Sequence, residues 1–315
     1  MKDHVSAGLG KFDDPRITAK GEPRAQVALT KPETLWFNTG TLCNIACAHC
    51  YIESSPRNDR LVYITAAEVA DYLAQLESRG WGVREIGFTG GEPFMNPQMV
   101  AMARLCLEAG YDTLILSNAM RPMMRPKIQE GLAALQETYG DKLVVRVSLD
   151  HYAAETHNAE RGKGAFEQAL IGMGWLRDTG IAMGVAGRIE YAQSEADARA
   201  GYAALFAEHG FAIDAFNPAQ TVLFPEMDLS VDVPEITTAC WGILDKSPDE
   251  VMCASSRMVV KRKGAAGPSV VACTLLPYEP EFDLGATLEE AERSVSLNHP
   301  HCAKFCVLGG ASCSA

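Results

Sequence analysis

The sequence predicts an α/β fold in which parallel strands alternate with helices, followed by a smaller cysteine-rich unit. Three observations lead to this prediction. Apolar, β-rich runs alternate with helical patterns between residues 34 and 216, this alternation stops beyond about residue 218, and cysteines concentrate in the last part of the chain. A chain of 315 residues with 47% hydrophobic residues is long enough for one large α/β domain and one small domain.

The expected strands are short, rich in β-branched and aromatic residues, and followed by turns. They occupy residues 34–38, 85–89, 113–117, 142–149, 181–189 and 211–216. The helices between them have recognisable ends, because Thr65 and Glu68 form a capping box and Gly110 and Gly210 follow helix C-termini. They occupy residues 65–79, 98–109, 126–138, 165–178 and 194–208. Six strands joined by five helices imply parallel pairing with right-handed crossovers.

A cysteine triplet follows the first strand, in the run CNIACAHC. Cys43, Cys47 and Cys50 have the spacing C-x3-C-x2-C, which lets one loop hold three corners of a cubane iron–sulfur cluster and leaves the fourth iron open. A zinc site would need a fourth ligand, for which His49 is the only local candidate, and a disulfide would leave one cysteine unpaired. The spacing favours an open iron–sulfur site, with zinc binding, redox chemistry and buried core thiols as alternatives.

A Gly-Gly turn with an acid at its tip follows the second strand, in the run FTGGEP. Gly90 and Gly91 let the backbone approach a ligand closely, and exposed amides with the Glu92 carboxylate suit an amino-acid-like zwitterion. Together with the cysteine triplet, this element resembles the radical S-adenosylmethionine (SAM) superfamily, although His49 replaces the usual Phe or Tyr. The resemblance implies an open, partial (β/α)6 TIM-like barrel and a [4Fe–4S] cluster that binds SAM.

The resemblance also implies which residues bind the cofactor. In a parallel barrel, functional side chains collect at the C-terminal ends of the strands. Gly90, Gly91 and Glu92 are expected at the SAM amine, and Ser148 and Asp150 at its carboxylate or ribose, unless they serve only as caps and turns. Further expected cofactor-binding residues are Asn118, Arg161 and Arg188. Arg188 could instead meet a substrate carboxylate.

The tail contains a second set of cysteines. Residues 251–274 predict two strands around a turn with Cys253 and Cys273 at the outer ends, and Cys302 and Cys306 share one helical face. The tail resembles the twitch form of the family's C-terminal extension, the shorter relative of the SPASM form, which holds one auxiliary [4Fe–4S] cluster. The expected ligands are Cys253, Cys273, Cys302, Cys306 and Cys313. A zinc site or packed core thiols are the alternatives.

These inferences divide the chain into an N-terminal extension at 1–30, a radical SAM partial barrel at 31–217 and an auxiliary-cluster domain at 218–315. The resemblance implies that the reduced cluster cleaves SAM to methionine and a 5′-deoxyadenosyl radical, which takes a hydrogen atom from an unactivated substrate carbon. A flavodoxin- or ferredoxin-type protein would supply the electron. Because an auxiliary cluster can accept an electron from the substrate radical, we expect net two-electron oxidation of a small molecule. The expected binding partner is a small-molecule or short peptide substrate.

Other functions stay open at this stage. Within enzymes, the chain could be a peptide or protein maturase, or an epimerase in which Cys240 donates a hydrogen atom. Outside enzymes, it could be a zinc- or cluster-binding regulatory or electron-transfer protein.

Composition restricts the partners and the compartment. A formal net charge of −12 argues against a nucleic-acid partner. The first thirty residues contain no apolar stretch typical of a signal peptide, and no apolar run is long enough to span a membrane. Ten cysteines without a secretion signal favour metal or redox chemistry in a reducing compartment. We therefore expect a cytoplasmic enzyme.

Overall fold

The computed structural model describes residues 10–189, 193–225 and 231–310. Its strands are β1 (Gln26–Val27), β2 (Thr34–Asn38), β3 (Glu85–Thr89), β4 (Asp112–Ser117), β5 (Leu143–Ser148), β6 (Ala182–Ile189), β7 (Thr221–Pro225), β8 (Ser256–Val260), β9 (Ser269–Val271), β10 (Asp283–Gly285) and β11 (Val295–Ser296). Its α-helices are α1 (Ala66–Arg79), α2 (Met99–Glu108), α3 (Pro126–Tyr139), α4 (Ala154–Arg161), α5 (Ala165–Thr179), α6 (Glu195–His209) and α7 (Cys240–Leu244).

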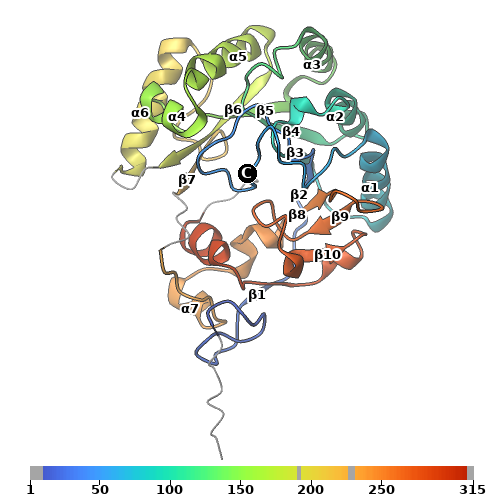
Figure 1. Cartoon of the computed structure of the whole chain (residues 1–315), viewed down its shortest axis with the longest axis vertical. Helices are drawn as coiled ribbons and strands as arrows, with labels where there is room; N and C mark the ends of the chain where they lie inside the picture. The colour runs from blue at the N-terminus through green and yellow to red at the C-terminus, as the bar shows by residue number, and fades with distance from the viewer. Residues whose placement is uncertain (1–9, 190–192, 226–230, 311–315) are drawn as a thin grey trace, which may run out of the picture.

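One nine-stranded sheet has the strand order β10-β9-β8-β2-β3-β4-β5-β6-β7. Strands β2 to β7 pair in chain order, and every one of these pairs is parallel. Helices α1 to α6 form an arc outside this curved sheet, and the C-terminal segments lie along its open side (Figure 1). The predicted α/β fold with a mostly parallel central sheet is therefore confirmed.

The parallel strands form the core because both of their faces are covered. All five residues of β2 are buried, and the rings of Phe37 and Phe88 stack with centroids 5.8 Å apart. In the preceding register pair, Trp36 with Gly87, a Cβ added at Gly87 would lie 2.4 Å from the Trp36 ring. Only glycine at this position lets the indole pack flat against β3.

The helices of the barrel agree with the sequence patterns, with one omission. Thr65 and Glu68 form the expected capping box at α1, because each side chain accepts a hydrogen bond from the other residue's backbone N–H. Helix α4 lies where the sequence predicted only a loop. Its N-cap residue, Ala153, offers no side-chain hydrogen bond and only His157 is buried, so neither a start signal nor an apolar stripe marks this helix.

The predicted strand at 211–216 is wrong, and the strand that follows β6 in the sheet is β7 at Thr221–Pro225. In the intervening loop, the Asp214 side chain accepts a hydrogen bond from the Phe216 amide at 2.8 Å. The Asn217 side chain likewise accepts one from the Ala219 amide at 2.9 Å. Such side-chain contacts hold the backbone in turns and compete with strand pairing. The boundary expected at residue 217 therefore precedes the last strand of the barrel sheet.

The tail hairpin is an extension of the barrel sheet. Strands β8 and β9 pair antiparallel, as the sequence predicted, and β8 also pairs parallel with β2. The N-terminal segment joins the same part of the molecule, because β1 pairs with β11 and Arg24 binds Glu235 at 2.6 Å. The extension and the tail thus form one packed unit below the barrel (Figure 1).

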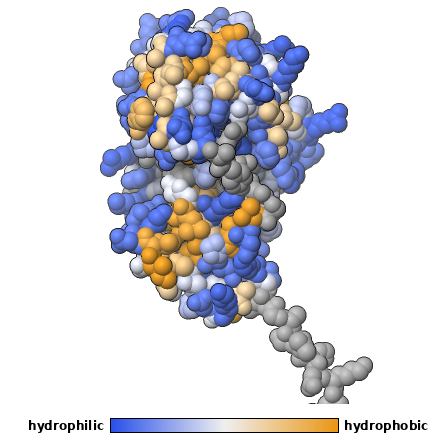
Figure 2. Space-filling model, turned by 90° about the vertical axis from the view of Figure 1, so that its left-hand side faces the viewer, coloured by the Kyte–Doolittle hydropathy of each residue, from blue (hydrophilic) through white to orange (hydrophobic). Residues whose placement is uncertain are grey.

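Figure 2 shows the side of the molecule that carries α6 and α7. Apolar side chains form patches on both the barrel part and the lower part of this face, within an otherwise hydrophilic surface. The exposed hydrophobic residues include Phe216 before β7 and Ile243 in α7. Among the described residues, no helix combines the length and apolar character needed to cross a membrane.

Candidate functional site

A cavity of about 170 Å³ opens at the C-terminal ends of the parallel strands. Loops after β2, β3, β4 and β5 contribute to its wall, together with β6 and the end of α4. The lining residues that sequence analysis named are Cys43, Cys47, Cys50, Gly90, Gly91, Asn118, Ser148, Asp150, Arg161 and Arg188. The fold thus brings these residues together in one cavity, as expected for side chains near the C-terminal ends of parallel strands. Their individual roles in binding remain predictions.

The three cysteines of the triplet face this cavity from one loop. Burial raises the pKa of the Cys43 thiol to about 12 and also raises the pKa of Cys47, although the Arg161 guanidinium opposes the latter shift. Metal binding requires thiolates, so iron would have to displace these protons. Three thiols on one cavity wall fit a cubane cluster with an open fourth iron.

The Gly-Gly turn packs directly against the cysteine loop. Gly90 has φ +145°, a conformation that other residues rarely adopt. A Cβ added at Gly91 would lie 2.2 Å from the carbonyl oxygen of Leu42, the residue before Cys43. The amide of Glu92 donates to this same oxygen at 3.1 Å. Glycine at these positions therefore lets the turn fix where the triplet begins.

Glu92 occupies a different place from the one expected. Its side chain is buried and does not line the cavity. The carboxylate accepts hydrogen bonds from the amides of Phe94 and Asn118 and from the Ser117 hydroxyl, at 3.1, 2.9 and 3.0 Å. The contact between Glu92 and SAM stays a prediction; in the structure, its carboxylate ties the turn after β3 to the end of β4.

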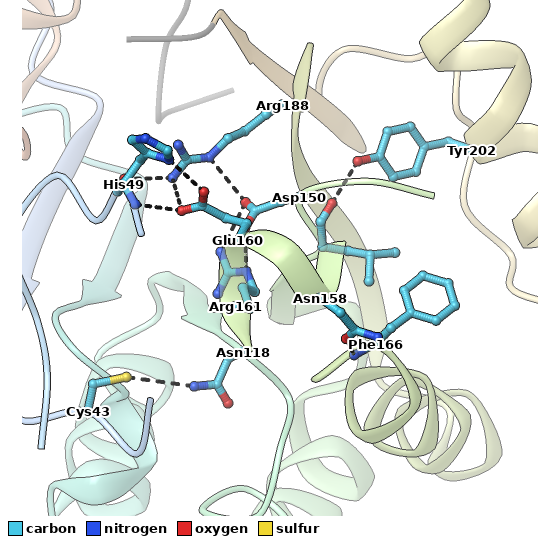
Figure 3. A network of polar contacts seen from close by, with 11 residues as sticks. Cys43, His49, Asn118, Asp150, Asn158, Glu160, Arg161, Phe166, Arg188 and Tyr202 are labelled. Carbon is cyan, nitrogen blue, oxygen red and sulfur yellow. Dashed lines mark hydrogen bonds and ion pairs between the residues drawn. The ribbon is translucent and has the colours of Figure 1, made fainter. Parts of the chain in front are cut away.

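Asn118 connects the end of β4 to the cysteine loop. Its side-chain amide donates to Asn44 Oδ1 at 2.9 Å and lies 3.9 Å from Cys43 Sγ. Figure 3 shows the Asn118 side chain pointing toward Cys43. Asn118 thus orients a predicted cluster ligand, in addition to lining the cavity.

A network of charged side chains from the loop after β5, from β6 and from α4 forms part of the cavity wall (Figure 3). Asp150 binds Arg161 through two hydrogen bonds of 2.6 and 3.1 Å, and it binds Arg188 at 3.3 Å. These arginines lower the pKa of the Asp150 carboxyl despite its burial. Arg188 also donates to the backbone oxygen of His49 at 2.8 Å and lies over the Tyr51 ring. The network therefore links β5, β6 and α4 to the cysteine loop.

His49 is held by the last turn of α4. Its amide and its Nδ1 each lie 2.8 Å from a carboxylate oxygen of Glu160, and the amide of Ala48 donates to the Glu160 backbone oxygen. The imidazole thus pairs with Glu160, which argues against its service as a zinc ligand beside the cysteines. Sequence reasoning missed Glu160, because nothing marked the helix that carries it.

A second, smaller cavity lies in the tail. Four cysteines line it, and most of its other lining residues are apolar. These cysteines are Cys253, Cys273, Cys302 and Cys306. The first two flank the β8–β9 hairpin, and the last two lie in a π-helical segment, Cys302–Leu308. Cys313 falls outside the described residues.

Burial dominates the chemistry of these tail thiols. It raises the pKa of Cys253, and it raises the pKa of Cys302 well above the usual range, with Cys253 and Cys273 adding to the effect. Once deprotonated, these thiols form a soft ligand set, which suits iron–sulfur clusters or zinc. The donor set therefore fits an auxiliary cluster.

The two cavities share a wall. Leu275 lines both of them, and the adjacent residues Cys273 and Thr274 line the tail cavity and the barrel cavity respectively. Phe305, from the segment that carries Cys302, lines the barrel cavity and packs on Tyr51 with ring centroids 6.3 Å apart. Sequence analysis did not identify Leu275 or Phe305, because apolar residues carry no chemical signal.

Cys240 lines neither cavity. It begins α7, and its sulfur lies 3.3 Å from the amide and 3.4 Å from the hydroxyl oxygen of Thr237. Hydrogen-atom donation by Cys240 therefore stays a prediction, and its distance from both cavities does not favour it.

Within the described ranges, no three His, Cys, Asp or Glu side chains gather closely enough to hold one metal ion. A cubane cluster distributes its ligands over several iron atoms, so its thiolates lie further apart than those around a single ion. Both cysteine sets are therefore compatible with a cubane cluster.

Comparison with known families identifies the barrel. A model of the Radical SAM superfamily matches residues 37–189, which contain the cysteine triplet, the Gly-Gly turn and β3 to β6. Residues 37–189 belong to the radical SAM superfamily. This superfamily uses a [4Fe–4S] cluster and SAM, and both are therefore cofactors of this radical SAM enzyme.

Two curated relatives cover the barrel region. The antilisterial bacteriocin subtilosin biosynthesis protein AlbA of Bacillus subtilis is 35% identical over 146 residues, which are 46% of this chain and 30% of AlbA. The AdoMet-dependent heme synthase of Methanosarcina barkeri is 30% identical over 156 residues, which are 48% of this chain and 41% of that protein. This radical SAM chain thus spans less than half of either relative.

A solved structure resembles the fold over a longer range. Streptococcus suis SuiB bound to SAM superposes with a TM-score of 0.59, covering 82% of this chain and 64% of SuiB at 13% identity. SuiB has also been solved bound to the precursor peptide SuiA. At this identity, the similarity supports the radical SAM fold.

Proposed function

We propose that this radical SAM enzyme carries out a net two-electron oxidation of a short peptide, with an auxiliary [4Fe–4S] cluster as electron acceptor. In this proposal, Cys43, Cys47 and Cys50 hold the SAM-binding cluster. The auxiliary cluster is held by Cys253, Cys273, Cys302 and Cys306, in a domain that begins after β7. When bound and reduced, the first cluster gives SAM one electron to form methionine and a 5′-deoxyadenosyl radical, which takes a hydrogen atom from substrate.

The shared wall between the two cavities carries this proposal. A substrate radical becomes a closed-shell product by losing one electron and one proton. Thr274 and Leu275 would contact substrate in the barrel cavity, while the neighbouring Cys273 would hold the auxiliary cluster. The electron would pass to that cluster and then to a flavodoxin- or ferredoxin-type protein, and the proton would pass to solvent.

A peptide substrate is supported by two observations. AlbA, the bacteriocin biosynthesis protein, and SuiB, solved with a precursor peptide, are among the similar proteins. In addition, β7 ends the nine-stranded sheet, and its Phe224 lines the cavity. An extended peptide can add to such an edge by main-chain hydrogen bonds.

A second candidate is oxidation of a small molecule. The resemblance to the heme synthase favours it, because that protein's name describes a non-peptide product. The barrel cavity is itself enclosed by Ile52, Leu116 and Leu275, which would suit an apolar molecule.

The cluster assignments are tested by iron content and SAM cleavage in anaerobically reconstituted protein. The wild type should hold about eight irons per chain. Replacing Cys43, Cys47 and Cys50 together by Ala should remove half of the iron and all reductive cleavage. Retained cleavage in this variant would contradict the assignment of the SAM-binding cluster.

The electron-acceptor role is tested with a Cys253→Ala, Cys273→Ala variant. It should lose the other half of the iron, still form 5′-deoxyadenosine and give no oxidised peptide. Cys106→Ala is the matched control, because Cys106 is also buried but lines neither cavity. Full turnover by the double variant would refute the acceptor role, and unchanged iron content would refute the auxiliary cluster.

A further inference from the structure

Arg257 is a buried cation behind the tail cysteines. It lies on β8, four residues after Cys253, and only 1% of it is exposed. Its guanidinium donates to the backbone oxygens of Cys253 at 2.6 Å, Ser256 at 2.8 Å, Ala291 at 2.9 Å and Arg293 at 3.2 Å. These contacts fix the guanidinium beside the backbone of one proposed cluster ligand.

Backbone oxygens accept the hydrogen bonds of the Arg257 guanidinium, but they do not neutralise its positive charge. Among the residues that the structure describes, no carboxylate forms an ion pair with it. Arg24, which is almost as deeply buried, has the usual arrangement, because Glu235 binds it at 2.6 Å. A buried cation without an anionic partner is strongly unfavourable, so a partner for Arg257 is to be expected.

The groups that can supply negative charge are the tail cysteines, which become thiolates when they bind a metal or cluster. Burial lowers the pKa of the Arg257 guanidinium to about 10, whereas Cys253 and Cys273 act to raise it. A guanidinium is protonated at neutral pH, and the hydrogen bond of 2.6 Å to the Cys253 backbone oxygen places this positive charge beside the tail cavity.

We propose that Arg257 is the counter-charge of the auxiliary cluster and keeps its reduction potential high enough to accept an electron. This inference rests on the auxiliary cluster of the proposed function. A [4Fe–4S] centre with four thiolates is already anionic, and reduction adds one more negative charge. A fixed cation in a medium of low dielectric constant stabilises the reduced form more than the oxidised form. Arg257 would act through the field of its charge, from a position fixed by its hydrogen bond to the Cys253 backbone oxygen.

The test uses the full chain with Cys43, Cys47 and Cys50 replaced by Ala, so that only the auxiliary cluster remains. Its midpoint potential is measured by a redox titration followed by electron paramagnetic resonance. Arg257→Met should lower the ratio of reduced to oxidised cluster at a fixed potential at least tenfold, which is 59 mV for one electron. Arg257→Lys should restore most of this ratio, because it keeps the charge. Arg24→Met is the matched control and should leave the potential unchanged.

The possible outcomes distinguish a failure of the proposed auxiliary cluster from a failure of the proposed counter-charge role. Absence of iron from the parent triple variant would overturn the auxiliary cluster itself, and this inference with it. An Arg257→Met variant with full iron and the parent potential would overturn only the counter-charge. Should Arg257→Met lose its cluster, retention of iron by Arg257→Lys supports a role for the charge. Equal loss in both variants shows a purely structural role and refutes the proposal.

Discussion

Replacing Glu92 by Gln should change how the stability of the protein depends on pH. Three hydrogen-bond donors favour the ionised form of this carboxyl group, but complete burial opposes it and raises the Glu92 pKa from 4.5 to about 7. One pKa unit corresponds to about 1.4 kcal/mol, so the shift is equivalent to about 3 kcal/mol. Burial is therefore expected to dominate over the three donors.

The direction in which the unfolding free energy changes with pH follows from proton binding in the native and unfolded states. Below the unfolded-state pKa of 4.5, Glu92 is protonated in both states and the shift has no effect. Between that value and about 7, only the native state holds the proton, so native stability falls as pH rises. Glutamine cannot titrate. The unfolding free energy of wild type minus that of Glu92→Gln should therefore decrease by about 3 kcal/mol across this window.

The measurement is equilibrium urea unfolding of iron-free protein at several pH values from about 4.5 to about 7.5. Ser117→Ala removes one donor to the carboxylate, so it should increase the pH dependence. The double variant Ser117→Ala, Glu92→Gln should lose that dependence and serves as the control. A difference between wild type and Glu92→Gln that stays constant, or grows with pH, would refute the reasoning, because the three donors would then outweigh burial.

Two further predictions concern the walls of the barrel cavity. Gly91→Ala should displace the cysteine loop and reduce bound iron, because its Cβ would lie 2.2 Å from the Leu42 carbonyl oxygen. Gly174→Ala, which has no atom within 4 Å of the added Cβ, should retain full iron. Asp150→Asn should destabilise the protein by about 3–5 kcal/mol in urea unfolding near neutral pH, because two arginines lose their shared carboxylate. Since the Asp150 pKa is lowered from 3.8, wild type and variant should converge as pH falls through the native value, and a constant difference would contradict this account.

The sequence determined the central α/β architecture and the two cysteine sets. Each strand from β2 to β6 is a short apolar run, and most helices carry their own start and stop signals, so local patterns were sufficient. The cysteine triplet and the Gly-Gly turn also identified the family, because their chemistry depends on spacing within one loop.

The tertiary structure decided which residues reach the cavities. Glu92 was expected to contact SAM, yet its carboxylate turns inward to donors on the next strand. Cys240 was a candidate hydrogen-atom donor, yet it lies in α7 and lines neither cavity. The direction of a side chain depends on partners that are distant in sequence, and no local pattern records them.

The same reason explains what sequence reasoning missed. Strand β8 joins the barrel sheet beside β2, although more than 200 residues separate them along the chain. This pairing places the tail cysteines and the apolar wall of Leu275 next to the barrel cavity. It also buries Arg257 behind Cys253 without a carboxylate partner among the described residues. Spacing along one loop determines which ligands a segment offers, whereas contacts between distant segments determine what those ligands face.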